Sequence, residues 1–516
     1  MPPPTLVAAI DDACRDASAR LAVTSGDSSI AYGELHRAID ALAGRYRELG
    51  IQRGDRIVCQ LSNRPETLVA AYAAWSCGAL HVALHHESTP RELNDVIDLV
   101  RPALLVYEPP CHSPRPLAAV DQLLADSPDL RVLLVTPRDG SVHGMTIASL
   151  LRRVPAAIEE TPAPPSPDDA AAIFLTSGTT GRPKTPLGFQ GRLARSWSGL
   201  SAALSFGPDD VHLIHLPLAH GFGLMLATAG LLGGGRVILL NRFASDEVLD
   251  VIAREQVTVL HGSATHFRLL LQRLAASPRD VRSLRIGVAS ASAFSPSLLH
   301  AMRDALQMDF MVMYGSSEGV GVATLDPSEY LGGSVGRPDD GAVAIVNEQH
   351  EHLPDGAEGE IAFSRAHFPV TYWTGDSHTG VEEVSSGWFY TGDLGRIDDG
   401  QLFVLGRLKH QINRGGSKID PLEVENAVLT LPGVAEAAVL AVPHPVLGEA
   451  VCACVVPGDG WSMTLNDLRA ALRDSLAPYK LPDDLRLLDR LPRTALGKVD
   501  VMQLSADLPP VGMASG

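Results

Sequence analysis

The sequence predicts an α/β protein with a large N-terminal domain of two doubly wound sheets, a small β-barrel-like subdomain and a small α+β C-terminal domain. Apolar runs of strand length alternate with helix-period segments from 21 to 107, and again from 211 to 314. Such alternation indicates mostly parallel sheets with helices on both faces. From about 333 to 408 the chain changes to short alternating strands with Gly and Asp turns.

Individual elements follow from the same patterns. The first sheet is predicted to contain strands at 57–61, 79–83 and 103–107, with helices at 64–77 and 90–100. The second sheet is predicted to contain strands at 211–215, 236–240, 257–260, 284–288 and 309–313. The C-terminal domain is predicted to contain helices at 421–430 and 465–476, with strands at 434–441 and 449–456. Proline-rich stretches at 109–116 and 162–167 are predicted to be exposed connections.

Composition narrows the class of protein. A chain of 516 residues is too long for a single core. Its formal net charge of -18 argues against nucleic-acid partners, which require a basic face. The six cysteines form no CxxC pair, which suits a reducing compartment, and Cys452 and Cys454 alternate along one predicted strand. The start of the chain lacks a signal-peptide pattern and no apolar run reaches membrane-spanning length, so we expect a cytoplasmic protein without a membrane partner.

A glycine- and hydroxyl-rich loop follows the apolar run at 171–175. Glycines let backbone N–H groups converge on an anion, hydroxyls add donors, and a lysine adds charge, so the loop is predicted to bind phosphate. Its residues are Thr176, Ser177, Gly178, Thr179, Thr180, Gly181 and Lys184. The Walker pattern is excluded because Pro183 stands where that motif requires glycine. An ordinary surface turn is the less favoured alternative.

Three further motifs carry polar residues whose role, functional or structural, would be ambiguous if each motif stood alone. Tyr314-Gly-Ser-Ser-Glu318 ends a predicted strand, where open α/β sheets place ligands. Asp393 follows Thr-Gly, a setting that also suits an aspartate at a turn. His220 lies between a predicted strand and a glycine-rich helix start, where a structural histidine is the alternative.

Together these motifs resemble the adenylate-forming superfamily of acyl-CoA synthetases, luciferases and peptide-synthetase adenylation domains, in its order and spacing. The resemblance implies an ATP site in which Tyr314 stacks on adenine, Asp393 binds the ribose hydroxyls and Arg407 reaches ribose and phosphate. It places Ser317 near the α-phosphate and assigns Glu318 to Mg²⁺. Gly315 and Ser292 are assigned to the nucleotide side of the same site.

The resemblance also implies a mobile C-terminal domain. It divides the chain into 1–408, which binds ATP and the acid, and 409–516, a lid that turns about a hinge at Lys409. Gly415 and Gly416 resemble the loop that passes the pantetheine arm, although Asn413 stands where many relatives have lysine. Lys498 resembles the catalytic lysine that orients the substrate carboxylate and offsets developing charge.

The acyl pocket is expected around His220. Its other predicted lining residues are Phe222, Gly223, Ser263, Ser290 and Ala291. The aspartate that binds an α-ammonium group in amino-acid-activating relatives is missing, so the acid is expected to lack a free α-amino group. Ser290 and Ala291 replace glycines, which favours a constricted channel for short-chain or aryl acids over long fatty acids. A second departure, Thr185-Pro186 after the loop lysine, is predicted to stiffen the loop or to be silent.

The predicted reaction is ATP-dependent formation of an acyl-adenylate, followed by transfer to coenzyme A with release of AMP and pyrophosphate. The alternative acceptor is the phosphopantetheine of a carrier protein. A luciferase-like oxygenase and a non-catalytic nucleotide-binding relative are less favoured, the latter because Glu318, Asp393, Arg407 and Lys498 are all present. Monomer and homodimer remain open.

Overall fold

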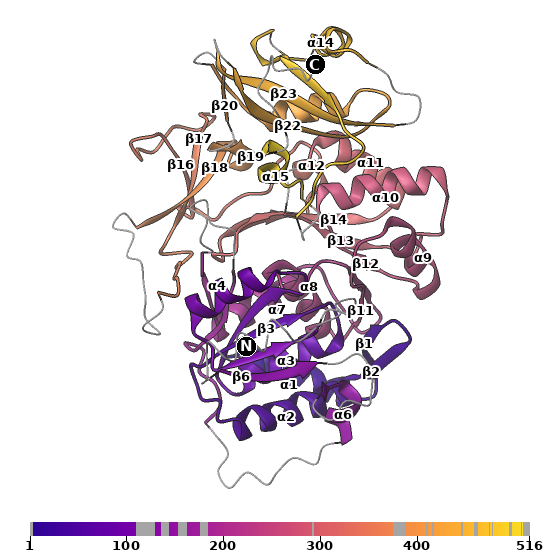
Figure 1. Ribbon diagram of the computed structural model, residues 1–516, viewed down its shortest axis with the longest axis vertical. Coiled ribbons are helices and arrows are strands. Elements are labelled where there is room, and N and C mark those ends of the chain that lie inside the picture. Colours follow the sequence, from indigo (N-terminus) through magenta and orange to yellow (C-terminus); the bar gives the residue numbers. More distant parts are fainter. Residues whose placement is uncertain are drawn as a thin grey trace.

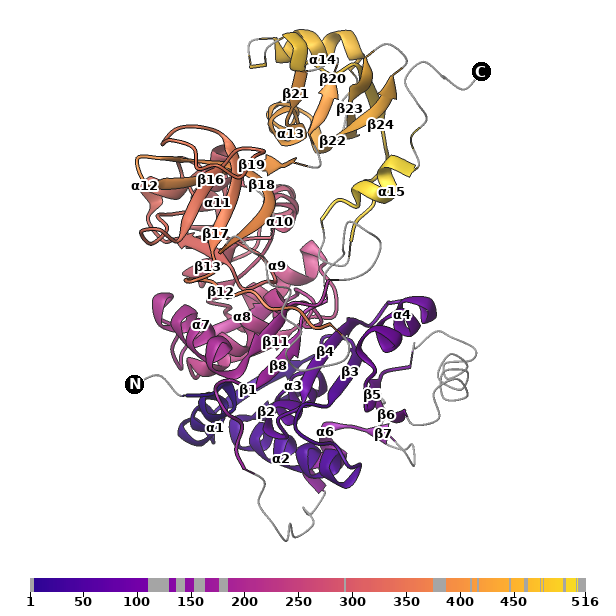
Figure 2. The same cartoon turned by 90° about the vertical axis from the view of Figure 1, so that its left-hand side faces the viewer.

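The computed structural model describes most of the chain. The residues that it describes are 4–109, 130–135, 144–152, 163–175, 184–291, 294–374, 387–408, 411–414, 417–444, 447–458, 463–473, 475–476, 478–494, 498–506 and 508. Figures 1 and 2 show two large sheets at one end of the long axis and the smaller C-terminal domain at the other.

The first sheet has seven strands in the order β7-β6-β5-β3-β4-β8-β9, and all of its pairs are parallel except β8 with β9. Its strands are β3 (Arg56–Leu61), β4 (Leu80–His85), β5 (Leu104–Tyr107), β6 (Arg131–Val135), β7 (Gly144–Met145), β8 (Ala170–Ile173) and β9 (Leu187–Phe189). Helices interleaved with them are α3 (Pro65–Ser76), α4 (Pro90–Val100) and α6 (Ile147–Arg152). α4 begins where its sequence predicts, because Thr89 and Glu92 form a reciprocal capping box around Pro90.

The second sheet has eight strands in the order β15-β14-β13-β12-β10-β11-β1-β2. Its strands are β1 (Leu21–Ser25), β2 (Ser28–Ala31), β10 (Val211–Ile214), β11 (Arg236–Leu239), β12 (Val259–Leu260), β13 (Ile286–Ala289), β14 (Asp309–Gly315) and β15 (Gly321–Thr324). Its helices are α7 (Gln190–Ala203), α8 (Gly221–Leu232), α9 (Ser245–Glu255), α10 (Ala264–Ala276), α11 (Pro296–Leu306) and α12 (Pro327–Tyr330). The N-terminal strand β1 pairs in parallel with β11, which the sequence pattern did not predict.

Helices fill the space between the two sheets. The largest apolar core joins inner-face residues of both sheets to α3, α7 and α8 and to the N-terminal helices α1 (Leu6–Asp16) and α2 (Tyr32–Glu48). α3 is buried almost all round, as expected for a helix with few polar residues. A second core packs α9, α10 and α11 on the outer face of the eight-stranded sheet, and a third packs α4 on the outer face of the other sheet. The doubly wound prediction is confirmed.

The β subdomain is an antiparallel sheet in the order β16-β17-β18-β19. Its strands are β16 (Val343–Val346), β17 (Gly359–Ser364), β18 (Trp388–Asp398) and β19 (Gln401–Arg407). Its apolar core includes Val320 and Val322 of the β14–β15 hairpin region, so the subdomain packs against the edge of the eight-stranded sheet.

The C-terminal domain is α+β, as predicted. Its sheet contains β20 (Ile412–Arg414), β21 (Ser417–Ile419), β22 (Val434–His444), β23 (Gly448–Pro457) and β24 (Asp484–Leu487). Its helices are α13 (Pro421–Leu429), α14 (Leu465–Leu472) and α15 (Val501–Ala506), with a 3₁₀ turn at Pro478–Lys480. Cys452 and Cys454 are buried on one face of β23, as their alternation predicts. None of the helices in the described ranges combines the length and apolar character needed to cross a bilayer.

Candidate active site

The predicted nucleotide residues meet where the eight-stranded sheet joins the β subdomain. Tyr314 is the penultimate residue of β14, while Asp393 and Arg407 lie directly opposite each other on β18 and β19. The Tyr314 hydroxyl donates to Asp393 Oδ2 at 2.7 Å, and Arg407 Nε donates to Asp393 Oδ1 at 2.8 Å. Tyr314, which lies 79 residues before Asp393, and Arg407, which lies 14 residues after it, therefore converge on one carboxylate.

The backbone around Asp393 is fixed by its neighbours. Thr391 Oγ1 donates to Ile361 O and accepts from the Asp393 N–H at 3.0 Å. Gly392 has φ +73°, a left-handed conformation that favours glycine, and its N–H donates to Glu360 Oε1 at 2.7 Å. The Thr-Gly-Asp sequence is thus needed locally, because each residue supplies a different part of this irregular stretch of β18.

Tyr314 is held as a neutral phenol. Burial, together with the charge of Asp393, raises the pKa of its hydroxyl well above the usual value. The ring stacks on Phe363, with centroids 6.1 Å apart and planes 29° from parallel. A protonated hydroxyl is the form that can donate to a carboxylate.

Glu318 and Lys184 form the second polar centre. The two side chains approach to 4.0 Å, and the Tyr372 hydroxyl donates to Glu318 Oε1 at 3.2 Å. Glu318 is 9% exposed and Lys184 51% exposed, so the carboxylate is sheltered while the ammonium faces solvent. A sheltered carboxylate beside a lysine that is predicted to bind phosphate has the hard oxygen donors that suit Mg²⁺.

The segment after Lys184 is tied to the chain at 371–373. Thr185 Oγ1 donates to Trp373 O at 2.8 Å, the Trp373 N–H donates to Thr185 O at 2.9 Å, and Pro186 forms a bridge with Tyr372. Thr185-Pro186 therefore anchors one end of the predicted phosphate loop. The loop residues Thr176, Ser177, Gly178, Thr179, Thr180 and Gly181 lie outside the described residues.

His220 is the N-cap residue of α8 and is neutral. Its Nδ1 accepts from the Phe222 N–H at 3.1 Å, which requires Nδ1 to be unprotonated. Burial, and then the charge of Lys498, lowers the pKa of its imidazole to about 4. At neutral pH the other nitrogen, Nε2, therefore carries the ring proton.

Lys498 reaches this site from the C-terminal domain. Desolvation and then the positive charge of Arg407 lower the pKa of its ammonium, while Asp393 raises it. The residue retains exposed surface, yet protein groups surround it closely enough to act on its charge. The charge of Lys498 thus affects the pKa of His220, and the charges of Asp393 and Arg407 affect the pKa of Lys498.

The remaining predicted acyl-pocket residues lie at the carboxyl ends of β12 and β13 and in α8. Ser263 Oγ lies 3.0 Å from Nδ1 of His266, which is in the first turn of α10. Ser290 Oγ donates to Met313 O at 2.7 Å. Phe222 is buried, and any side chain at Gly223 would collide with Pro217 O. These contacts place each residue, but none of them joins Ser263 directly to His220.

Ala291 has an unusual backbone conformation. Its φ is +67°, in the left-handed region, where a glycine would be unstrained. The structure therefore explains why glycine is the expected residue here and shows that alanine is accommodated at a cost.

Other predicted residues are placed less fully. Gly315 closes β14, where a Cβ would lie 2.8 Å from Val320 O, and Ser317 is half-buried. Ser292, Lys409, Gly415 and Gly416 lie outside the described residues. Sequence reasoning missed Glu360 and Tyr372, whose side chains bind Gly392 and Glu318, because neither belongs to a recognisable motif.

Comparison with known proteins identifies the class to which this fold and site belong. A family model described as AMP-binding enzyme matches residues 10–373, and the AMP-binding enzyme C-terminal domain matches residues 423–498. The chain belongs to the AMP-binding enzyme family, and the predicted resemblance to the adenylate-forming superfamily is confirmed.

Among its relatives is a feruloyl-CoA synthase of Amycolatopsis sp, 33% identical over 93% of this chain and 94% of that protein. Another is a 2-hydroxy-7-methoxy-5-methyl-1-naphthoate–CoA ligase of Streptomyces carzinostaticus, 31% identical over 96% and 91% of the two chains. The crystal structure of ATP-bound MatB from Rhodopseudomonas palustris superposes with a TM-score of 0.85, at 29% identity, over 98% and 99% of the two chains. The protein is accordingly an AMP-forming acid–thiol ligase, as predicted.

Proposed function

We propose that the protein activates an aryl carboxylic acid with ATP and passes the acyl group to coenzyme A. The observation that carries this proposal is the convergence of Tyr314 and Arg407 on Asp393, with Lys498 near enough for its charge to lower the pKa of His220. A cation there would lie between the nucleotide residues and the predicted acyl pocket, where the acid and the α-phosphate must meet.

In the first step a carboxylate oxygen of the acid attacks the α-phosphorus of ATP. The bond from that phosphorus to the β-phosphate oxygen breaks, and pyrophosphate leaves with the electron pair. Asp393 would hold the ribose hydroxyls, Tyr314 the adenine, and Arg407 the ribose and α-phosphate. Lys498 would orient the acid and offset charge as it develops on the phosphate, so catalysis rests on positioning and electrostatics.

Mg²⁺ fits beside Glu318. The sheltered carboxylate offers one hard oxygen ligand, and phosphate oxygens would provide others. The bound ion would neutralise phosphate charge. Lys184 and the hydroxyls and glycines of 176–181 would bind the β- and γ-phosphates.

In the second step a thiol sulfur attacks the acyl carbon, the mixed anhydride bond breaks, and AMP leaves as the thiol proton is lost. We propose that domain 409–516 turns against domain 1–408 about Lys409 between the steps, so that Gly415 and Gly416 line the path of the pantetheine arm. Such a rotation would withdraw Lys498 after it has acted.

The proposed acid is aromatic. The relatives named for feruloyl and naphthoate substrates favour this choice, and Ser290 and Ala291 add side-chain volume where glycines are usual in the superfamily. A narrow slot suits a planar ring better than a long alkyl chain. We also propose that the enzyme works in the cytoplasm.

The test is pyrophosphate release from ATP and Mg²⁺ with ferulate, benzoate, butyrate and palmitate, each with and without coenzyme A. We expect ferulate or benzoate to give the highest rate and coenzyme A to be converted to a thioester. Palmitate as the best substrate would overturn the aryl proposal. Adenylate formation without transfer to coenzyme A would favour the carrier-protein acceptor, and no activity with any acid would overturn the proposed function.

A further inference from the structure

A buried asparagine links the two large sheets beside the predicted acyl pocket. Asn63 lies between β3 and α3 and is only 5% exposed. Its Nδ2 donates to Leu216 O at 2.8 Å and to Leu240 O at 2.9 Å, while its Oδ1 accepts from the Leu218 N–H at 2.8 Å. The amide thus uses both of its donor hydrogens and its acceptor on backbone groups more than 150 residues away.

The partners of Asn63 belong to the chain that leads to His220. Leu216 and Leu218 lie between the end of β10 and the start of α8, and Leu240 follows β11. β10 and β11 are in the eight-stranded sheet, whereas β3 is in the seven-stranded sheet. Asn63 therefore joins the carboxyl ends of strands from both sheets, which is the edge where such sheets bind ligands.

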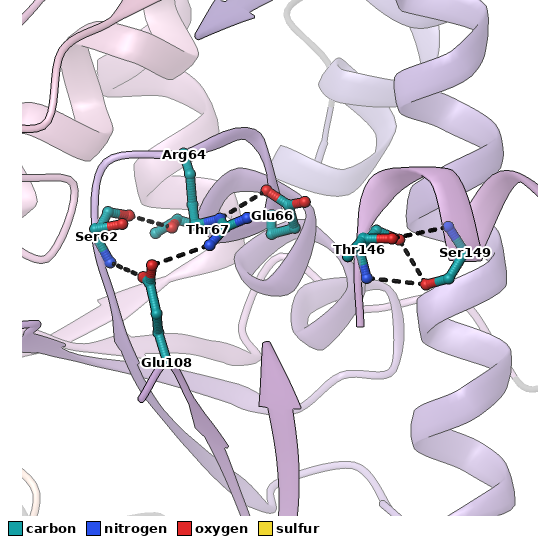
Figure 3. Close-up of polar contacts among 7 residues, drawn as sticks. All are labelled: Ser62, Arg64, Glu66, Thr67, Glu108, Thr146 and Ser149. Atoms are coloured by element: carbon teal, nitrogen blue, oxygen red, sulfur yellow. Dashed lines mark hydrogen bonds and ion pairs between the residues drawn. The ribbon is translucent and has the colours of Figure 1, made fainter. Parts of the chain in front are cut away.

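The turn that carries Asn63 is itself fixed. Figure 3 shows Arg64 between two carboxylates, with Nε 2.9 Å from Glu66 Oε2 and Nη1 2.9 Å from Glu108 Oε1. Glu108 Oε2 also accepts from the Ser62 N–H at 2.8 Å, and Thr67 Oγ1 donates to Ser62 O at 2.6 Å. Both neighbours of Asn63 are thereby held in place by partly buried polar contacts.

The 216–220 segment has little room to adjust. At Gly223 a Cβ would lie 2.3 Å from Pro217 O and 3.0 Å from Leu216 O, so the first turn of α8 packs directly on this segment. A shift of the segment would therefore move the start of α8, including His220 and Phe222.

We propose that Asn63 is a positioning residue for acid recognition, which fixes the 216–220 segment and through it His220. The inference rests on the proposed function for its catalytic consequence. Asparagine suits the position because aspartate of the same shape has no N–H group and would set a negative charge against two carbonyl oxygens.

The test compares Asn63→Asp with Gln190→Glu. Gln190 is a matched control, since its buried amide oxygen accepts from the distant Leu6 N–H at 3.2 Å, and its side chain makes no hydrogen bond to the His220 segment among the described residues. For Asn63→Asp we expect kcat/KM for ferulate to fall about tenfold or more, with the KM for ATP nearly unchanged. The ratio of ferulate to butyrate turnover should change in Asn63→Asp and stay constant in Gln190→Glu.

Hydrogen exchange supplies a readout that needs no substrate. Faster exchange in peptides covering 216–224 of Asn63→Asp, but not of Gln190→Glu, would support the positioning role even if the wild-type enzyme proved inactive on every acid tested. Equal exchange in the two variants, or an equal loss of ATP and acid affinity, would overturn it.

Asn63→Asp could fail to fold. In that case Glu108→Gln takes its place, because it keeps the side-chain shape while weakening the contacts that hold Arg64 and Ser62. In Glu108→Gln, kcat/KM for ferulate should fall about two- to threefold, with the KM for ATP nearly unchanged. Exchange in peptides covering 216–224 should also become faster. An unchanged ferulate-to-butyrate ratio and unchanged exchange at 216–224 in a folded Glu108→Gln would also contradict the proposal.

Discussion

At the scale of single residues, the site contains ionisable side chains whose hydrogen bonds and pKa values depend on neighbouring groups. Asp393 accepts from both a neutral phenol and a guanidinium, so each of its oxygens has a partner within the protein. Ribose hydroxyls would compete with or replace these partners. A carboxylate so placed is predicted to matter for nucleotide binding more than for folding.

Asp393→Asn should weaken ATP use. The neutral amide offers only one acceptor oxygen, and loss of a hydrogen bond to a charged group is worth about 1.5–3 kcal/mol, or roughly 10- to 150-fold in kcat/KM for ATP. Steady-state pyrophosphate release measures this. Asp398→Asn, on the exposed end of the same strand, is the control and should leave kcat/KM for ATP unchanged. Equal effects of both substitutions would argue against the ribose assignment.

Lys498→Ala should separate the two half-reactions. Removal of a cation that stabilises the transition state is expected to slow adenylate formation about 10²- to 10³-fold. Thioester formation from a supplied acyl-adenylate should be nearly unaffected. Lys480→Ala is a suitable control, since that lysine is also in the C-terminal domain but pairs with Glu423. Equal losses in both half-reactions would show that the role of Lys498 is misassigned.

At the scale of elements, strand ends and the loops after them decide the geometry of the site. The turn after β13 carries Ser290, whose side chain is tied to β14 through Met313 O, and then Ala291 in a left-handed conformation. Asn63, which follows β3, and Thr185, which precedes β9, likewise fix their loops through side-chain hydrogen bonds to distant backbone carbonyl oxygens. The polar residues of these loops are therefore structural partners of the residues that would contact substrate.

Ala291→Gly should stabilise the protein. A left-handed conformation costs an L-residue about 1–2 kcal/mol, which exceeds the added flexibility that glycine gives the unfolded chain, so a net gain of roughly 0.5–1 kcal/mol is expected. Urea denaturation provides the measurement. Ala289→Gly, two residues earlier in buried β13, should have the opposite effect. A loss of stability in Ala291→Gly would contradict the strain argument.

At the scale of the whole molecule, buried imidazoles couple stability to pH. Burial lowers the pKa values of His81, His212 and His266 to about 4, from an ordinary value of 6.5. These groups stay neutral in the folded protein when the unfolded chain has already bound protons. The unfolded state therefore binds more protons between about pH 6.5 and pH 4, and stability must fall as the pH falls through this window.

The free energy of unfolding is thus expected to drop by roughly 1 kcal/mol for each such histidine per pH unit below its unfolded pKa. Urea midpoints between pH 7.5 and pH 5 measure the slope. His81→Leu should reduce the dependence of stability on pH, because the unfolded variant binds up to one proton fewer than the unfolded wild type. The substitution removes no hydrogen bond, since neither ring nitrogen of His81 has a partner in the described structure. His300→Gln, at an exposed position, should not alter the pH dependence. A pH-independent midpoint in wild type would refute the linkage.

Most of the elements could be predicted from the sequence, because their signals are local. The helix at 90–100 is marked by Thr89, Pro90 and Glu92 within four residues, and the strands by short apolar runs. The order of the motifs was likewise enough to indicate the superfamily, with its ATP chemistry. The resemblance also assigned Asp393 and Arg407 to one nucleotide site, whereas the ion pair between them came from the structure.

Only the tertiary structure decided which distant segments meet. β1 joins the second sheet beside β11, and Asn63 joins the His220 segment to the first sheet. Neither of these pairings leaves a periodic or compositional trace, because each depends on how complete sheets and domains pack. The sequence by itself therefore determined the elements, the family and the kind of chemistry, and the packing determined which residues hold the site in shape.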